Sequence, residues 1–238
     1  MAVNDEGNLR GMSAQLAVRT ARLQAGDASL GWKMGFGAPA AMHKLGIQFP
    51  LLGFLSRSAV LPSGASVALE SFARAAAEPE IAVHMGANLD AGADEQTARA
   101  AIAGLGPAIE LADLSFPPDD VERILAGNIY QRHVILGPMD TGRAGARLDG
   151  LSVRLLQDGS TVGETSDVEA NTGRIVDLIR GTADRLAVLD LKLRAGEVVI
   201  AGSTIPPLFV DRACTVSFKL DPFAAITVHF TAGNQLRP

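Results

Sequence analysis

Short apolar runs, bounded by glycine, proline or polar turn residues, recur along this chain. Runs of about four to eight such residues are typical of β-strands. They outnumber the segments with helical periodicity. They also do not alternate with helices strictly, as the strands of a doubly wound parallel sheet would. The pattern therefore predicts a mixed, largely antiparallel α+β fold.

The expected elements follow from these runs and their breaks. Helices are expected at residues 8–25, 38–47, 93–105, 117–127 and 171–191. Strands are expected at 29–37, 75–86, 106–116, 131–137, 151–156, 160–165, 197–203, 214–220 and 224–230, with shorter strands and turns between 51 and 70. The residues QDGS at 157–160 predict a hairpin. No internal repeat or linker is visible, so we expect one domain over residues 1–238 with a helical N-terminal portion at about 1–30.

The composition excludes several classes of protein. With 47% hydrophobic and 20% charged residues, the chain resembles an ordinary globular protein. Its net charge of −5 gives no basic surface for nucleic acid. No stretch approaches the roughly 20 apolar residues that span a bilayer, and the acidic N-terminus is not a secretory signal. The single cysteine, Cys214, fits a reducing compartment. We therefore expect a soluble, cytoplasmic protein that binds neither nucleic acid nor membrane.

Acidic residues interrupt two of the expected strands. In AAAEPEIAVHMG (75–86), Glu78 and Glu80 are two residues apart, so a strand directs both side chains to the same face. In GPAIELADLSF (106–116), Glu110 lies between two apolar neighbours. Three converging carboxylates would repel one another unless a cation neutralised them. An all-oxygen ligand set suits a hard divalent ion such as Mg²⁺ or Mn²⁺.

Both the glutamates and a nearby lysine also have ordinary interpretations. Isolated glutamates on a strand usually lie on its solvated face, so the E-x-E pattern alone is weak evidence for a metal site. Lys33 in SLGWKMGFG faces the same way as Gly35, where it can act as a base or an electrostatic clamp on a substrate. Lysines in such places also commonly extend along a strand end into solvent. Both alternatives stay open at the level of sequence.

Six segments carry a resemblance to a known family through their order in the chain. They are GWKMGFG, HKLGIQFPLLGFL, EPEIAVHMG, GPAIELADLSF, ILAGNIYQRHVILGP and LRAGEVVIAGS. In this order they resemble the 2-keto-4-pentenoate hydratase and 4-oxalocrotonate decarboxylase family, which belongs to the fumarylacetoacetate hydrolase superfamily. The resemblance covers residues 31–230, and the order is more specific than any single segment.

The resemblance implies a fold and a metal site. The family's fold is a mixed β-roll with flanking helices, which agrees with the strand-rich pattern. In the family, the E-x-E pair and the later glutamate hold a Mg²⁺ or Mn²⁺ ion. Those roles fall here on Glu78, Glu80 and Glu110.

The resemblance also places residues that would act on a substrate. The family lysine falls on Lys33, for which proton transfer or substrate orientation is expected. The family asparagine falls on Asn128, and Ser203 ends the last of the six segments. Asn128 and Ser203 are our candidates for substrate binding.

The implied activity is that of a divalent metal-dependent lyase of aromatic catabolism acting on a small 2-oxo acid, expected to be a homo-oligomer. Hydration of a 2-hydroxy-2,4-dienoate to a 4-hydroxy-2-oxo acid is the first hypothesis. A 4-oxalocrotonate-type decarboxylase, an acylpyruvate C–C hydrolase and a non-catalytic binder of metal or 2-oxo acid are the alternatives.

The chain departs from the family pattern at its polar positions. It has GAP at 37–39 where a hydroxyl residue is usual, and Gly127 where an aspartate is usual. No arginine follows Glu110 closely, and DVEANTGR (167–174) replaces a GHP segment. These departures predict a substrate with an uncharged tail.

Overall fold

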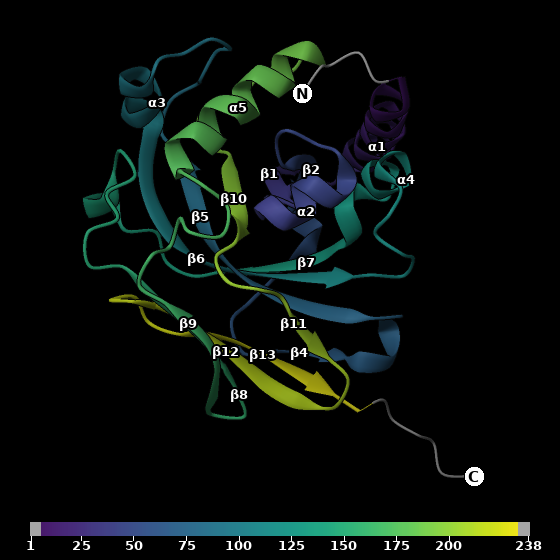
Figure 1. Cartoon of the computed structure of the whole chain (residues 1–238), viewed down its shortest axis with the longest axis vertical. Coiled ribbons are helices and arrows are strands. Elements are labelled where there is room, and N and C mark those ends of the chain that lie inside the picture. The colour runs from purple at the N-terminus through teal and green to yellow at the C-terminus, as the bar shows by residue number, and fades with distance from the viewer. Residues whose placement is uncertain (1–5, 233–238) are drawn as a thin grey trace.

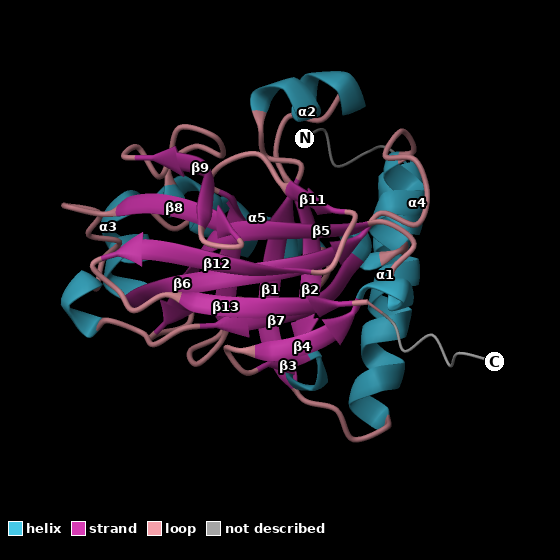
Figure 2. Cartoon of the chain, turned by 90° about the horizontal axis from the view of Figure 1, so that it is seen from below, coloured by secondary structure: helices cyan, strands magenta, loops and turns pink. Residues whose placement is uncertain are grey.

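The computed structural model describes residues 6–232, and two β-sheets with flanking helices form its architecture (Figures 1 and 2). The helices are α1 (Glu6–Gln24), α2 (Pro39–Leu45), α3 (Glu95–Ala101), α4 (Val121–Ala126) and α5 (Ile175–Val188). The strands are β1 (Ser29–Gly35), β2 (Leu51–Ser56), β3 (Val60–Leu61), β4 (Ala65–Ala68), β5 (Ala75–Met85), β6 (Ile102–Asp113), β7 (Gln131–Leu136), β8 (Ser152–Gln157), β9 (Ser160–Thr165), β10 (Val198–Ser203), β11 (Leu208–Val210), β12 (Cys214–Asp221) and β13 (Ile226–Thr231).

The strand order confirms the expected mixed, largely antiparallel α+β fold. The larger sheet has eight strands in the order β2-β1-β10-β5-β6-β7-β3, and β11 also pairs with β5. The smaller sheet has five strands in the order β4-β13-β12-β8-β9. Three pairs are parallel, β1 with β10, β3 with β7 and β4 with β13, and the other strand pairs are antiparallel.

The main hydrophobic core joins both sheets to α5. Phe218 on β12, Val199 on β10 and Ile179 on α5 are all buried in one apolar cluster. A second apolar cluster joins α1 and α4 to β2, the last strand of the larger sheet. Figure 1 shows the two helices next to each other. Both sheets thus share one core, and the single domain over residues 1–238 stays a prediction. Residues 1–5 and 233–238, which that expectation included, lie outside the described residues.

Some expected boundaries are wrong. The helix expected at 93–105 ends at Ala101, and Ile102 begins β6, which pairs along the length of β5. The helix expected at 171–191 is α5, which starts only at Ile175, so residues 171–174 form a loop. Strand β11 was not expected. Strand pairing with segments distant in sequence decides these boundaries. Local apolar periodicity carries no information about such pairing, so it could not predict them.

Between residues 6 and 232, no helix combines the length and the apolar composition that crossing a bilayer requires.

Candidate metal centre and pocket

The three glutamates of the sequence pattern converge on one point of the larger sheet. Glu78 on β5 stands directly opposite Glu110 on β6 in the antiparallel register, and Glu80 follows two residues along on the same face. Carboxylate oxygens of all three lie within 4.8 Å of one another. Like charges directly opposite each other destabilise a sheet, so this arrangement calls for a compensating cation.

The burial of two of these carboxylates strengthens the need for a compensating cation. Glu80 and Glu110 are 0% exposed, so the solvated-face interpretation is wrong for both. Glu80 Oε1 and Glu110 Oε2 have no hydrogen-bond partner in the structure. A buried carboxylate oxygen without a partner is costly. These unpaired, converging oxygens form a donor set that fits a hard divalent ion.

An irregularity in β10 provides the hydrogen bond that Glu80 does make. The pairing of β10 with β5 shifts register between Ile200 and Ser203. Gly202 adopts a φ of 87° at this point, a conformation that glycine tolerates best. Its N–H donates to Glu80 Oε2 at 2.7 Å. One oxygen of Glu80 is thereby fixed, and the other remains available to a ligand.

Lys33 lies inside the sheet beside the glutamates and is only 2% exposed. Its Nζ donates to Glu110 Oε1 and to the carbonyl oxygen of Ile129, the latter at 3.0 Å. The interpretation of Lys33 as a solvated strand-end lysine is therefore wrong. A buried ammonium compensates one of the three carboxylates and leaves an excess of negative charge for a metal ion.

The pKa values respond to this crowding. Burial, followed by the charge of Glu110, raises the pKa of Glu78 to about 7, although Lys33 opposes the change. Burial also raises the pKa of Glu80 well above its ordinary range. Without a bound cation, the cluster therefore tends to retain protons near neutral pH.

A cavity of about 280 Å³ lies next to this cluster and is lined by Lys33 and Glu78. Among the described residues that line it, these two are the charged ones; the neutral polar ones include Tyr130, Asn171, Thr172 and Ser203. The rest of the wall is largely apolar. Its apolar residues are Phe36, Ala38, Ala41, Ala112, Leu114, Pro118, Ile129, Pro207 and Phe209.

Sequence reasoning did not name Asn171 and Thr172 as site residues. Both belong to the segment 167–174, which was noted only as a departure from the family pattern. Asn171 Nδ2 donates to the carbonyl oxygen of Ser203 at 2.7 Å, which ties this loop to the end of β10. The departure itself was thus the available signal, but its place in the pocket wall depends on the tertiary structure.

A short turn at Asn128–Tyr130 borders the pocket, and its backbone is left-handed. Asn128, Ile129 and Tyr130 have φ angles of 51°, 53° and 61°. This conformation costs on the order of 1–2 kcal/mol per non-glycine residue, and β-branched residues rarely adopt it. Strain of this kind persists only where surrounding contacts impose it.

The two expected substrate-binding residues have different surroundings. Ser203 lines the cavity, and its hydroxyl donates to the carbonyl oxygen of Ile205 at 2.7 Å. Asn128 is not among the lining residues, and both polar atoms of its side chain bond to the backbone of Phe54. The geometry gives no support to a direct contact between Asn128 and a substrate.

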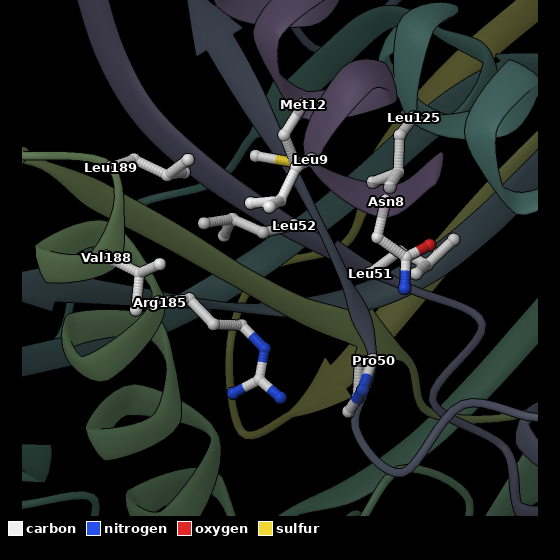
Figure 3. A pocket seen from close by; sticks show the side chains of 10 residues that line it. All are labelled: Asn8, Leu9, Met12, Pro50, Leu51, Leu52, Leu125, Arg185, Val188 and Leu189. Atoms are coloured by element: carbon white, nitrogen blue, oxygen red, sulfur yellow. The ribbon is translucent and has the colours of Figure 1, made fainter. Parts of the chain in front are cut away.

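A second pocket lies away from the acidic cluster, where α1, β2 and the end of α5 meet (Figure 3). Leu9, Met12, Leu52 and Val188 contribute apolar side chains, and Arg185 supplies a cation. No carboxylate is among its described lining residues. The glutamates that can hold a divalent ion therefore lie beside the cavity lined by Lys33 and Glu78, and not beside this pocket.

Comparison with known proteins identifies relatives over most of the chain, although no protein-family model matches it. The chain is 29% identical over 211 residues to a 2-keto-4-pentenoate hydratase of Burkholderia vietnamiensis, covering 87% of this chain and 79% of the relative. It is 24% identical over 216 residues to a 4-oxalocrotonate decarboxylase of a Pseudomonas species, covering 88% and 82%. The solved 4-oxalocrotonate decarboxylase of Pseudomonas putida G7, complexed with magnesium and adipate, matches with a TM-score of 0.85 at 23% identity, covering 92% and 84%.

The fold is that of the fumarylacetoacetate hydrolase superfamily, which is represented among the other solved structures that match. In sequence, the chain is similar to a 2-keto-4-pentenoate hydratase and a 4-oxalocrotonate decarboxylase, as the order of its segments indicated. The magnesium in the decarboxylase structure agrees with the divalent ion expected from the sequence.

The acidic cluster generates a prediction about metal binding. Isothermal titration of the metal-free protein should show saturable binding of Mg²⁺ or Mn²⁺, and the double variant Glu80→Gln/Glu110→Gln should lose it, because two carboxylates are replaced by neutral amides. Glu164→Gln, which removes an exposed carboxylate on β9, is the matched control and should bind like the parent. Unchanged binding by the double variant would refute the site.

The raised pKa of Glu78 predicts how stability depends on pH. Its pKa is about 7 in the folded protein and 4.5 for the ordinary side chain, so the folded state retains a proton that the unfolded chain releases. Where the folded state binds more protons, the free energy of unfolding falls as pH rises. In EDTA, the melting temperature of the parent should therefore decrease between about pH 4.5 and pH 7 more steeply than that of Glu78→Gln. Equal slopes would contradict the prediction.

Proposed function

We propose that this protein is a divalent metal-dependent hydro-lyase that adds water to a 2-hydroxy-2,4-dienoate to give a 4-hydroxy-2-oxo acid. The convergence of half-buried Glu78 with the fully buried Glu80 and Glu110 beside Lys33, next to a largely apolar cavity, carries the proposal. The hydratase relative supports the type of reaction. Mg²⁺ or Mn²⁺ is the proposed ion.

The three glutamates would hold that ion, and a bound divalent ion supplies Lewis-acid polarisation of the carboxylate and 2-oxo oxygens of such a substrate. The chain's own residues would handle the protons. Conversion of the dienol into its 2-oxo-3-enoate tautomer moves a proton from the 2-hydroxyl group to C5, and water then adds at C4. Lys33 is the proposed proton carrier or orienting group, because it lines the cavity and its Nζ donates to Glu110.

Tyr130 is a poor alternative to Lys33. Burial raises the pKa of Tyr130 to about 12, which keeps its hydroxyl group protonated at neutral pH. That hydroxyl group also donates to the carbonyl oxygen of Phe116 at 3.1 Å. Tyr130 therefore suits the wall of the cavity better than a role in proton abstraction.

The cavity wall supports a substrate with an uncharged tail. Beyond Lys33 and Glu78, the described lining offers neutral polar and apolar side chains. A second carboxylate on the substrate would lose its hydration there without gaining a cationic partner. A short hydrocarbon tail would instead be stabilised by contact with Phe36, Leu114 and Phe209.

One observation favours a different substrate. Arg74 is exposed, and its guanidinium carbon lies 4.1 Å from the ring centroid of Phe209, which lines the cavity. A cation next to the rim is where the distal carboxylate of a diacid would find a partner. Decarboxylation of an oxalocrotonate-type diacid is therefore the second candidate, and acylpyruvate C–C hydrolysis and non-catalytic binding remain further alternatives.

A cytoplasmic location and a homo-oligomeric state are part of the proposal. The free, buried thiol of Cys214 supports a reducing compartment. The net charge of −5 supports a small-molecule substrate over nucleic acid. The homo-oligomer remains a prediction.

The proposed role of Lys33 predicts a selective loss of turnover. Lys33→Met keeps most of the side-chain volume and removes the ammonium group. Turnover of the dienoate should fall by about 10²-fold or more, the usual contribution of a general acid or base. Lys192→Met removes an exposed lysine that pairs with Asp90, and it should behave like the parent. Turnover of Lys33→Met within a few-fold of the parent would exclude the role.

The reaction itself is tested by product analysis. The metal-loaded protein should remove the dienol absorbance of a 2-hydroxy-2,4-dienoate with a hydrocarbon tail and should produce a 4-hydroxy-2-oxo acid, identified by mass spectrometry. An oxalocrotonate-type diacid should react more slowly. Release of CO₂ from the diacid, with the dienoate left intact, would replace the hydratase by the second candidate. Inactivity toward both would favour non-catalytic binding.

A further inference from the structure

The aliphatic part of Lys33 is held in a narrow space beside Gly53. Lys33 on β1 stands directly opposite Gly53 on β2 in the register of the two strands. A Cβ atom at position 53 would come within 2.9 Å of Lys33 Cγ and within 3.0 Å of Asn128 Oδ1. Only the absence of a side chain at Gly53 leaves room for both groups. The side chains of Lys33 and Asn128 therefore both pack against Gly53.

The Asn128 side chain hydrogen-bonds to the backbone of β2 along the edge that has no neighbouring strand. β2 is the last strand of the larger sheet, so one edge of it has no neighbouring strand. Asn128 Oδ1 accepts a hydrogen bond from the N–H of Phe54 at 2.9 Å, and its Nδ2 donates to the carbonyl oxygen of Phe54 at 3.0 Å. The carboxamide thus makes the pair of bonds that another strand would make. Phe54 is the residue next to Gly53.

The left-handed turn directs the following carbonyl group to Lys33. With Asn128 fixed to Phe54, Ile129 presents its carbonyl oxygen to Lys33 Nζ at 3.0 Å. The side chain of Ile129 is 2% exposed and lies against Gly35, where an added Cβ would come within 2.7 Å of its Cγ2 atom. The ammonium group is therefore held between this carbonyl oxygen and Glu110 Oε1.

We infer that Asn128 is a positioning residue that fixes the left-handed turn to β2 and thereby sets the place of the Lys33 ammonium group. It acts through Lys33 and does not contact the substrate. The inference rests on the proposed function in so far as Lys33 transfers a proton there. Misplacement of a reacting group by about 1 Å can lower a rate by about 10²-fold, which sets the scale of the effect.

The central variant is Asn128→Gly. Glycine adopts positive φ readily, so this change keeps the turn conformation accessible and removes only the two bonds to Phe54. The kcat for dienoate hydration should fall by at least about 10-fold, with KM and Mg²⁺ affinity within about two-fold, because the lost interaction orients a reacting group. Asn88→Gly removes an exposed asparagine that bonds the N–H of Ala195, and it should retain the parent kinetics.

A double-mutant cycle distinguishes positioning from substrate contact. If Asn128 acts through Lys33, adding Asn128→Gly to Lys33→Met should cause no further loss of kcat. Fully additive losses, or a raised KM with unchanged kcat, would overturn the inference in favour of direct substrate contact. Parent-like kinetics of a folded Asn128→Gly protein would overturn it as well.

A readout without catalysis separates this inference from the proposed reaction. In a ¹⁵N-lysine-labelled protein, the buried ammonium of Lys33 should give a slowly exchanging resonance, assigned by its loss in Lys33→Met. Asn128→Gly should shift or broaden this resonance, and Asn88→Gly should not. An unchanged resonance would overturn the positioning role even if the parent proved inactive toward dienoates. Gly53→Ala, whose Cβ would crowd both Lys33 and Asn128, should reproduce the effects and replaces Asn128→Gly if that variant does not fold.

Discussion

Electrostatic repulsion among three carboxylates inside a sheet is the constraint on which the rest of this structure depends. Glu78 and Glu110 stand opposite each other in the β5–β6 pair, and Glu80 follows on the same face. Glu80 and Glu110 are fully buried, and Glu78 is half-buried. One ammonium group, that of Lys33, compensates part of this charge. The remaining negative charge is what makes the cluster suited to a divalent cation. Burial, followed by the charge of Glu110, raises the pKa values of Glu78 and Glu80.

Supporting the cluster requires departures from regular structure nearby. The register shift in β10 turns the N–H of Gly202 toward Glu80, and the left-handed turn at Asn128–Tyr130 turns the Ile129 carbonyl oxygen toward Lys33. Each departure places a backbone group at a charged side chain that would otherwise have fewer partners. Backbone strain at such positions persists because the neighbouring strands and side-chain bonds hold it in place.

The cavity explains how one scaffold can serve several related reactions. Its charged end, with Lys33 and Glu78, is where the 2-oxo acid portion of the proposed substrate would bind. Its remaining wall comes from loops and edges, including α2, the loop before α5 and β11. Segments of this kind change without disturbing the sheet. Differences in the loop that carries Asn171 and Thr172 would therefore alter the preferred tail while leaving the acidic cluster intact.

The sequence by itself determined the α+β class, most of the elements and the candidate cluster of glutamates, because strand periodicity directs Glu78 and Glu80 to one face whatever the rest of the chain does. The tertiary structure decided what depends on partners distant in sequence. It set the start of β6 at Ile102, the burial of Lys33 and the loop at 171–174 that enters the cavity wall. It also gave Asn128 a bond to Phe54 instead of a place in the cavity. Local pattern fixes the direction of a side chain relative to its own strand, and only the packing of distant segments fixes what that side chain meets.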